Sequence, residues 1–491
     1  MNKLFRNLSY LIISIIISAC SVDDDFSTSI ADHFTFSSDT LKTGTVISMQ
    51  GSSTRGFVIY NRSSKGLRIQ HVALEKGIKA SGFRVNVSGT SIGDAYQGEI
   101  DVRKGDSLQV FVEITPNKQH SNLPILIEDK LTFTLESGLR QEVILQAYGQ
   151  DVVTLRKMVV NSDTTLRSAC PYVVFDSIYV AKGATLTIEK GVTLMFHNNA
   201  SLVVDGSLNA LGTMQHPITF RGDRLDDMFE NQPYDRIAGQ WKGIYLNGTS
   251  THNYFNYCDI HSSYVGIDCQ PSDLNIEKLK IENSIVHNTK GDGLSLKECN
   301  VFVGNTQLTN ALHRCVAQYG GISTFVHCTI GQFYPFSGNR MSALFYTNEY
   351  NGNVAPLHAA TFLNCVITGY SSDEISAYKT ILSDPVLFEY HFENSLLNTP
   401  ETIDAERIIN VVWDNKENPV CCENNFLDFK ISHLLFDFRL HAKSKAIGLG
   451  NSTITQQYYP TDRLGIDRLS NNASDAGCYE YVESSTSSVV Q

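Results

Sequence analysis

Short stretches in which apolar and polar residues alternate dominate the chain from residue 36 to residue 150. The runs Leu108-Gln-Val-Phe-Val-Glu-Ile114 and Leu131-Thr-Phe-Thr-Leu135 show the pattern most clearly. Alternation puts the apolar side chains of a strand on one face. About seven such strands, separated by turn residues, predict an antiparallel β-sandwich of the immunoglobulin-like kind in this segment.

The pattern changes after Asp151. Apolar runs of three to five residues follow one another closely, each bounded by Gly, Asn or Lys, as in residues 183–188, 191–196 and 206–210. Such strands are too short and too closely spaced for a sandwich. They favour a solenoid in which each coil has about three short strands joined by turns.

A repeated hexamer supports the solenoid. Each copy has Cys, Ser or Thr at its third place and Ile, Val or Leu at its fifth. The copies occupy residues 256–261, 282–287, 304–309, 326–331, 363–368 and 393–398. Parallel strands stacked about 4.8 Å apart place equivalent residues directly over one another. We therefore expect the third-place residues to form an interior column, namely Cys258, Ser284, Thr306, Cys328, Cys365 and Ser395.

The first residues carry an export signal. A positively charged start and an apolar run over residues 11–17 fit a secretory signal peptide at residues 1–19, and the run is too short to span a bilayer. Ile17-Ser-Ala-Cys20 resembles a lipobox, which implies acylation of Cys20 and a tether at residues 20–35. An ordinary signal peptide with an incidental cysteine is the alternative. The acidic Asp23-Asp-Asp25 resembles the surface-export signal of Bacteroidota lipoproteins.

Two further resemblances concern the predicted domains. Tyr60-Asn61, Gly105-Asp-Ser107 and Tyr148-Gly-Gln150 resemble immunoglobulin-like domains of the Hydin/ASPM type, which implies a spacer or interaction module at residues 36–150. Asp462-Arg-Leu-Gly465 and Asp475-Ala-Gly-Cys-Tyr-Glu480 resemble the closing segment of bacterial-surface β-helix proteins.

The complete layout is similar to a Bacteroidota surface lipoprotein with a right-handed parallel β-helix of the pectate-lyase-like superfamily. The resemblance implies an all-β protein. Its immunoglobulin-like β-sandwich is followed by a right-handed parallel β-helix with a C-terminal cap at residues 152–480, and residues 481–491 form a tail. A fold of this kind does not by itself indicate an enzymatic activity.

Composition narrows the function classes. The formal charge of −12 is spread along the 491 residues, whereas nucleic-acid binding needs clustered Lys and Arg, so nucleic acid is excluded as a partner. Of the 11 cysteines, those other than Cys20 form no CxxC pair and no zinc-like spacing with His. Small buried thiols are the favoured interpretation.

One dense polar constellation stands out. It consists of Arg221, Asp223, Arg224, Asp226, Asp227, Tyr234 and Asp235, and Trp241 follows it. These residues are candidates for binding a cation or an anionic sugar, with Trp241 as a stacking platform. The structural alternative, which we favour for the charged residues, is that Arg and Asp pair with one another to pin a long loop. For Trp241 a wedge at the base of that loop is an equal alternative to the stacking platform.

Other candidates for chemistry are weaker. Lys290 and Asp292 lie in a Gly-rich turn, and His313 and Arg314, with Tyr319 nearby, offer a base and a cation. Structural roles are favoured for all of them. His261 and His287 occupy the same place in the hexamer repeat. A hydrogen-bonded column of these two histidines is favoured over a metal site, and no metal is predicted.

Three functions remain open. The sequence favours a non-catalytic module that binds glycan or protein, anchored in the outer membrane by its lipid and exposed at the cell surface. The first alternative is a polysaccharide lyase or glycoside hydrolase acting on acidic polysaccharide, with Ca²⁺ as cofactor only in the lyase case. The second is a structural or adhesive envelope protein. No cofactor is expected otherwise.

Overall fold

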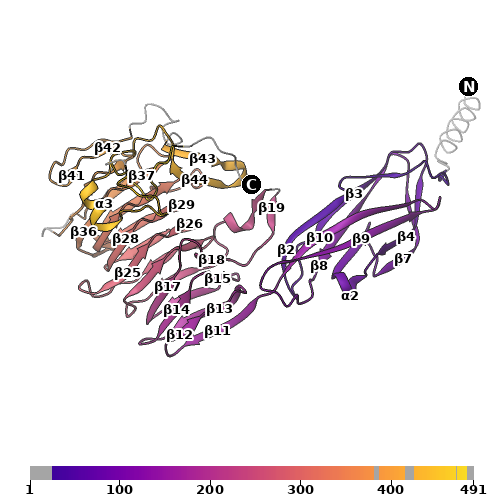
Figure 1. Ribbon diagram of the computed structural model, residues 1–491, viewed down its shortest axis with the longest axis horizontal. Helices are drawn as coiled ribbons and strands as arrows, with labels where there is room; N and C mark the ends of the chain where they lie inside the picture. Colours follow the sequence, from indigo (N-terminus) through magenta and orange to yellow (C-terminus); the bar gives the residue numbers. More distant parts are fainter. Residues whose placement is uncertain (1–24, 230, 381–385, 415–424, 471–472, 484–491) are drawn as a thin grey trace, which may run out of the picture. The chain divides into compact units, whose positions relative to one another are not determined.

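The computed structural model describes residues 25–229, 231–380, 386–414, 425–470 and 473–483. The chain divides into two compact units, Met1–Asp151 and Val152–Gln491 (Figure 1). Cys20, Cys421 and Cys422 lie outside the described residues. Within the described residues, no helix is long and apolar enough to cross a membrane.

The first unit is a sandwich of two five-stranded sheets. One has the order β1 (Phe34–Phe36), β3 (Arg55–Asn61), β8 (Ser107–Ile114), β5 (Phe83–Val87) and β6 (Thr90–Ser91). The other has the order β2 (Thr40–Ile47), β10 (Arg140–Gln150), β9 (Ile125–Leu135), β4 (Leu67–Leu74) and β7 (Ala95–Val102). β10 pairs parallel with β2, and the other pairs are antiparallel. A four-residue helix, α2 (Ile78–Ser81), precedes β5.

Two of the three motifs that carried the immunoglobulin-like resemblance, Tyr60-Asn61 and Gly105–Ser107, meet in space. Asn61 is buried, and its side-chain amide donates to the carbonyls of Lys65, Val102 and Arg103. Its backbone N–H donates to the carbonyl of Asp106 at 3.0 Å. Since a buried amide without partners destabilises a fold, this hydrogen bonding explains why Asn is tolerated at the end of β3.

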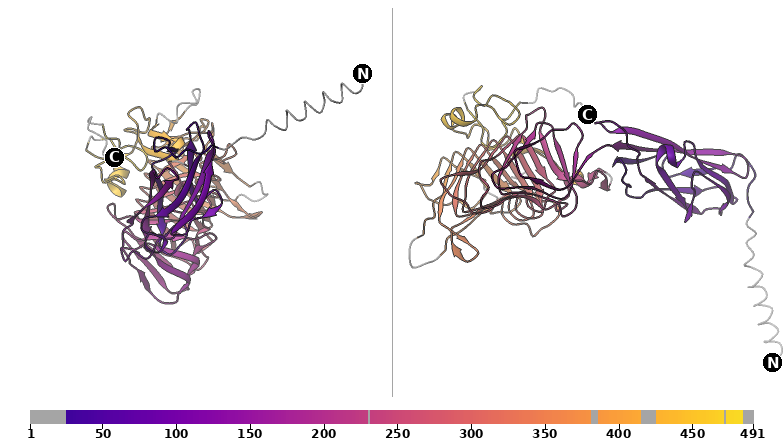
Figure 2. Two further views of the ribbon diagram at one scale, coloured as in Figure 1. Left: turned by 90° about the vertical axis from the view of Figure 1, so that its right-hand side faces the viewer. Right: turned by 90° about the horizontal axis from the view of Figure 1, so that it is seen from below.

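The second unit is a parallel β-helix built from three stacks of short strands (Figures 1 and 2). The first stack contains β12 (Thr164–Leu166), β14 (Thr185–Glu189), β17 (Ser207–Leu211), β22 (Asn253–Asn256), β25 (Glu277–Glu282), β28 (Asn300–Gly304), β31 (Gly321–Val326), β36 (Leu357–Leu363), β39 (His391–Glu393) and β41 (Ile408–Ile409).

The other two stacks begin at long strands shared between them. β13 (Tyr172–Val180) pairs with β11 (Val153–Val160), and then with both β15 and β16. From there the second stack runs through β15 (Thr193–Phe196), β18 (Ile218–Gly222), β23 (Cys258–His261), β26 (Ile285–Thr289), β29 (Gln307–Ala311), β32 (Thr329–Gln332), β37 (Val366–Gly369), β40 (Leu396–Leu397) and β42 (Val412–Trp413). The third runs through β16 (Ser201–Val204), β21 (Gly243–Leu246), β24 (Ile267–Cys269), β27 (Leu294–Lys297), β30 (Val316–Tyr319), β33 (Leu344–Thr347) and β38 (Ile375–Tyr378).

The repeated hexamer is the corner between the first and second stacks. Its second residue has a positive φ in every copy, and these residues are Tyr257, Asn283, Asn305, His327, Asn364 and Asn394. Asn adopts this left-handed conformation more readily than most residues, so the chain can turn sharply there. The third-place side chains point inward, and Cys258, Ser284, Thr306, Cys328, Cys365 and Ser395 are all 0% exposed.

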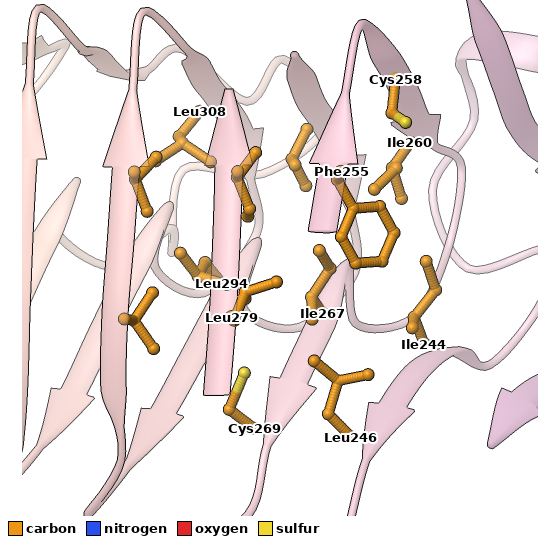
Figure 3. Close-up of a cluster of buried hydrophobic side chains, with 14 of the residues drawn as sticks. Ile244, Leu246, Phe255, Cys258, Ile260, Ile267, Cys269, Leu279, Leu294 and Leu308 are labelled. Atoms are coloured by element: carbon orange, nitrogen blue, oxygen red, sulfur yellow. The ribbon is translucent and has the colours of Figure 1, made fainter. Parts of the chain in front are cut away.

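Hydrogen bonds run along this interior column. The backbone N–H of Cys258 donates to Ser284 Oγ at 3.0 Å, and that of Ser284 donates to Thr306 Oγ1 at 3.3 Å. Farther along, the N–H of Cys365 donates to Ser395 Oγ. Aliphatic and aromatic side chains fill the rest of the interior, including Ile244 and Phe255 (Figure 3). The described cysteines other than Cys170 are free thiols, and all of them are buried.

The C-terminal segment lies along this corner. It contains β43 (Phe426–Lys430), η3 (Ile431–His433), β44 (Leu435–Leu440) and α3 (Ser452–Tyr458). Along the corner, Glu282 accepts from Tyr459 and Asn394 donates to the carbonyl of Leu449. Ahead of these coils, Gln232 and Arg236 donate to the carbonyls of Ser432 and His433. The segment expected to cap the last coil therefore covers the flank of several coils, because its polar residues match the polar corner.

The predicted fold class is confirmed. The protein is all-β, with an immunoglobulin-like sandwich followed by a parallel β-helix. The expected interior column is present over all six hexamers, with each third-place residue fully buried.

Candidate functional site

Candidate residues from the sequence lie at two sites on the β-helix. The first lies on the outer surface of the third stack. There Lys297 pairs in register with Tyr319, Tyr319 with Thr347, and Thr347 with Tyr378. Because side chains alternate across a strand, all four point to the same outer face.

A hairpin beside this face turns it into a groove. The hairpin consists of β34 (Glu349–Tyr350) and β35 (Asn353–Val354) and directly follows β33. It encloses a hollow of about 360 Å³, lined chiefly by Asp292, Lys297, Tyr319, Phe345, Tyr350 and Tyr378. We call this hollow the aromatic groove.

The aromatic rings of the groove support one another and remain accessible. The Tyr319 ring lies 5.6 Å from that of Phe345 and 5.4 Å from that of Tyr350, measured between centroids. Tyr378 is 50% exposed at one end. The Arg314 guanidinium covers the other face of Phe345, 4.2 Å from its centroid. Rings held in this way present a rigid apolar surface to a ligand.

The lysine in the lining of the groove already has an ion-pair partner. Lys297 forms a close ion pair with Asp268, and its ammonium lies 5.8 Å from the centroid of Tyr350. Burial raises the pKa of Asp292. The backbone N–H of Arg314, which donates to Asp292 Oδ1 at 3.2 Å, lowers the pKa but does not outweigh burial. Glu349 provides a second carboxyl group in the lining. The groove therefore offers two carboxyl groups and one cation that already has a partner.

The structure brings three of the weaker candidates together at this groove. Asp292 and Tyr319 line it, and Arg314 holds both Asp292 and Phe345. Lys290 and His313 are absent from its lining. The Lys290 side chain lies against Gly239 instead.

The second site is a chain of charges on the outer face of the second stack. Arg221 Nε lies 3.0 Å from Asp235 Oδ1, and that oxygen lies 2.7 Å from His261 Nε2. His261 Nδ1 is 2.8 Å from Asp259 Oδ1, which is also 3.1 Å from His287 Nε2. We call these five residues the histidine–aspartate network.

The two histidines belong to adjacent strands. His261 pairs in register with His287, and their rings stack with centroids 4.7 Å apart. Burial lowers the pKa of His261, but Asp259 and Asp235 outweigh it and raise the pKa to about 9. Burial likewise opposes ionisation of Asp259, and the two histidines overcome it, so its pKa lies well below the usual range. At neutral pH His261 and Asp259 are therefore an ion pair.

The remaining members of the predicted constellation pair mostly within the loop. Arg224 donates to both carboxylate oxygens of Asp226, and its guanidinium lies 3.8 Å from the Tyr234 centroid. Asp223 accepts from His197 at 2.6 Å. Asp227 begins the short hairpin of β19 (Asp227–Phe229) and β20 (Gln232–Pro233), which η1 (Tyr234–Arg236) follows. These contacts leave the loop charges engaged with neighbouring residues.

Trp241 cannot act as a sugar platform. It is 1% exposed, its ring stacks on Phe196 at 4.2 Å, and its indole N–H donates to the carbonyl of His261. The alternative from the sequence, a wedge at the base of the loop, describes its position.

Several residues of the two sites were not singled out from the sequence. They are Phe345, Glu349, Tyr350 and Tyr378 in the groove and Asp259 in the network. Tyr319 lies 22 residues after Lys297, one coil length, so the coil spacing could have placed these two side by side. The hairpin interrupts that spacing, and Tyr350 shows no periodic signal.

Comparisons with known proteins give partial matches. No family model matches the chain. A stretch of 120 residues is 31% identical to part of Protein bark beetle from Drosophila melanogaster, covering 23% of this chain and 4% of that protein. The chain thus corresponds to a small fraction of that relative's length.

Two solved structures show weak similarity to parts of the chain. A family 123 glycoside hydrolase from Clostridium perfringens has a TM-score of 0.18 and 7% identity, over 26% of this chain and 30% of that chain. The ASH/PapD-like domain (PapD-like domain 7) of human CEP192 has a TM-score of 0.17 and 9% identity, over 26% of this chain and 89% of that chain. These likenesses carry no argument about function.

Proposed function

We propose that this chain is a non-catalytic glycan-binding module that uses the aromatic groove. The observation that supports it is the set of four rings, Tyr319, Phe345, Tyr350 and Tyr378, around one hollow with polar groups at its edge. Sugar rings have apolar C–H faces that pack on aromatic side chains, and hydroxyls that need fixed hydrogen-bond partners. The groove offers both.

The charges favour a neutral glycan. Asp292 and Glu349 are acceptors for sugar hydroxyls but repel a uronate carboxylate. Lys297, the cation in the lining, is paired with Asp268. A uronate would therefore have to compete for that ammonium, whereas a neutral sugar would leave the pair intact.

The proposal includes an envelope anchor. Acylation of Cys20 would hold the chain in the outer membrane, and the surface-export resemblance of Asp23–Asp25 supports exposure at the exterior. The tether would be shorter than the residues 20–35 expected from the sequence, because Phe26 already bridges to Gly66 and Phe34 begins β1. Acyl labelling of the chain and of a Cys20→Ala variant tests the anchor. Label on both forms would disprove it.

Glycan binding by the full mature chain can be measured on a glycan array and then by calorimetry with the best ligand. We expect Tyr319→Ala and Tyr378→Ala each to weaken binding about tenfold, equivalent to about 1.4 kcal/mol. Tyr148→Ala is the matched control, because Tyr148 is 45% exposed and lies in the first unit. Its affinity should equal that of the unmodified chain.

Two results would contradict the proposal. Unchanged affinity in both groove variants would place binding elsewhere. Release of reducing ends or of unsaturated uronides during the incubation would show that the chain is an enzyme. The two carboxyl groups in the groove give hydrolysis a structural basis as the second candidate, because glycoside hydrolases use such a pair.

A further inference from the structure

We propose that Asp259, His261 and His287 form a site for a divalent transition metal, with Zn²⁺ as the preferred ion. The inference is independent of glycan binding, because the groove and this site share no residue. It departs from the sequence prediction, in which no metal site was expected.

The three donors converge on one point. One ligand atom from each residue lies within 4.8 Å of the other two. Asp259 Oδ1 is already 2.8 Å from His261 Nδ1 and 3.1 Å from His287 Nε2. Ligands about 2.0–2.2 Å from one metal ion are themselves roughly 3–3.5 Å apart, so a small opening of this group accommodates the ion.

The strands fix this arrangement. Asp259 and His261 are two residues apart on β23 and so point to the same face, and His287 is the register partner of His261 on β26. A donor set built on paired strands is held more rigidly than one built on loops. The side chains of Asp259 and His287 are 32% and 23% exposed, which leaves the metal a route from solvent.

An outer carboxylate completes the arrangement around His261. When Nδ1 binds a metal, Nε2 keeps its proton and donates it to Asp235 Oδ1 at 2.7 Å. Asp235 in turn is held by Arg221. A metal-bound histidine that donates its second N–H to a carboxylate is the usual arrangement, since the carboxylate orients the ring and raises its basicity. On binding, the ion would take the place of the protons that His261 Nδ1 and His287 Nε2 direct at Asp259 Oδ1, and both protons would pass to solvent.

A cavity adjoins the third ligand. His287 lines a hollow of about 280 Å³ together with Asn288 and Asn310. The side-chain oxygens of both asparagines are buried and have no hydrogen-bond partner among the described residues. Unpartnered buried oxygens in a polar hollow need water or a ligand. They support an open fourth position, occupied by water, beside a three-ligand metal.

The donor chemistry selects the ion. Two imidazoles and one carboxylate, with a fourth position open, match zinc sites of the two-histidine, one-carboxylate type. Ca²⁺ and Mg²⁺ require six or more oxygen ligands and are disfavoured by imidazole. We therefore expect Zn²⁺ and Co²⁺ to bind and Ca²⁺ not to bind.

The experiment is calorimetric titration of the EDTA-treated, dialysed full mature chain with ZnCl₂, repeated with CaCl₂, followed by the visible spectrum of the Co²⁺ form. One Zn²⁺ per chain and Co²⁺ bands of a four-coordinate site are expected. His287→Ala should weaken Zn²⁺ binding by about 100-fold or more, and Asp235→Asn by about 10- to 100-fold. His197→Ala is the matched control, since His197 also pairs with an aspartate but lies outside the cluster.

The unmodified chain and the His287→Ala variant together decide whether the metal site exists. No Zn²⁺ binding by the unmodified chain, or binding that His287→Ala leaves unchanged, overturns the proposal. Binding of Ca²⁺ in preference to Zn²⁺ overturns it as well. Because His287 is partly exposed, its removal should preserve the fold, which far-UV circular dichroism checks. Glycan binding by His287→Ala should be unchanged, so the two proposals can fail separately.

Discussion

At the scale of single residues, the β-helix stabilises buried charges by surrounding them with hydrogen-bond partners. Arg468 is 0% exposed, yet its guanidinium donates to Asn305 Oδ1, to Glu480 Oε2 and to the carbonyl of Gly477. Glu480 lies beside the buried carboxyl group of Asp475. Burial and this second acid raise the pKa of Glu480 to about 7, despite the nearby arginine.

This raised pKa predicts a pH-dependent stability. The folded chain holds the Glu480 proton up to about pH 7, whereas the unfolded chain releases it near the ordinary value of 4.5. The favourable contribution is therefore complete below pH 4.5 and is lost as pH rises through 7. It corresponds to about 3 kcal/mol at most. We expect the free energy of urea unfolding to fall between pH 5 and pH 8 and to fall less in Glu480→Gln. Identical pH profiles for both proteins would contradict the assignment.

At the scale of elements, the corner between the first and second stacks determines the coil. Asn283 donates to Asn256 Oδ1 at 2.9 Å, and Asn305 donates to Asn283 Oδ1 at 2.8 Å. The corner asparagines thus serve both the left-handed turn and a row of side-chain hydrogen bonds. Tyr257 and His327 occupy the same left-handed position without being asparagine.

Paired substitutions at Asn305 separate these two contributions. Asn305→Ala should cost about 3 kcal/mol of unfolding free energy, from a strained left-handed backbone and lost hydrogen bonds. Asn305→Gly loses the same bonds but relieves the strain, so it should cost about 1 kcal/mol less than the alanine variant. Urea unfolding followed by circular dichroism measures both values. Equal costs would show that the backbone conformation contributes nothing.

The sequence predicted the elements best where the coil repeats without interruption. The spacing of 22 residues from Ser284 to Thr306 and on to Cys328 predicted an interior column, because one strand contact fixes the next. Insertions between the strands of a coil were harder to predict from the sequence. The hairpin beside β33 and the pairing of Arg224 with Asp226 depend on contacts that no repeat specifies. Exposure of Trp241 was also undetermined, since its partner Phe196 lies 45 residues earlier.

At the scale of the whole molecule, the chain contains two units with separate apolar interiors. One comprises buried residues from Phe34 to Ala147, and the other begins at Val160. The position of the C-terminal segment could not be predicted from a motif, because its partners Glu282 and Asn305 are more than 160 residues away. Such long-range contacts leave no local trace in the sequence.

Separate interiors predict independent folding. Fragments 25–151 and 152–483 should each show a cooperative thermal transition, because each unit buries its own apolar side chains. Circular dichroism melts of the two fragments should add up to the melt of residues 25–483. A fragment that lacks a cooperative transition, while the longer chain retains it, would show that one unit depends on the other.

The C-terminal segment also limits where coils can be added to the β-helix. Tyr459 donates to Glu282, Arg468 donates to Asn305, and the backbone N–H of Gly477 donates to the carbonyl of Asn364, so three points of one segment are each bound to a different coil. A duplicated coil within this span would shift every later coil by one layer, so its residues would no longer face their hydrogen-bond partners in the C-terminal segment. A coil added ahead of β17 would precede these contacts, and also those of Gln232 and Arg236 with the carbonyls of Ser432 and His433, so it would leave all of them aligned. Growth of the solenoid during evolution is therefore easier at its amino-terminal end.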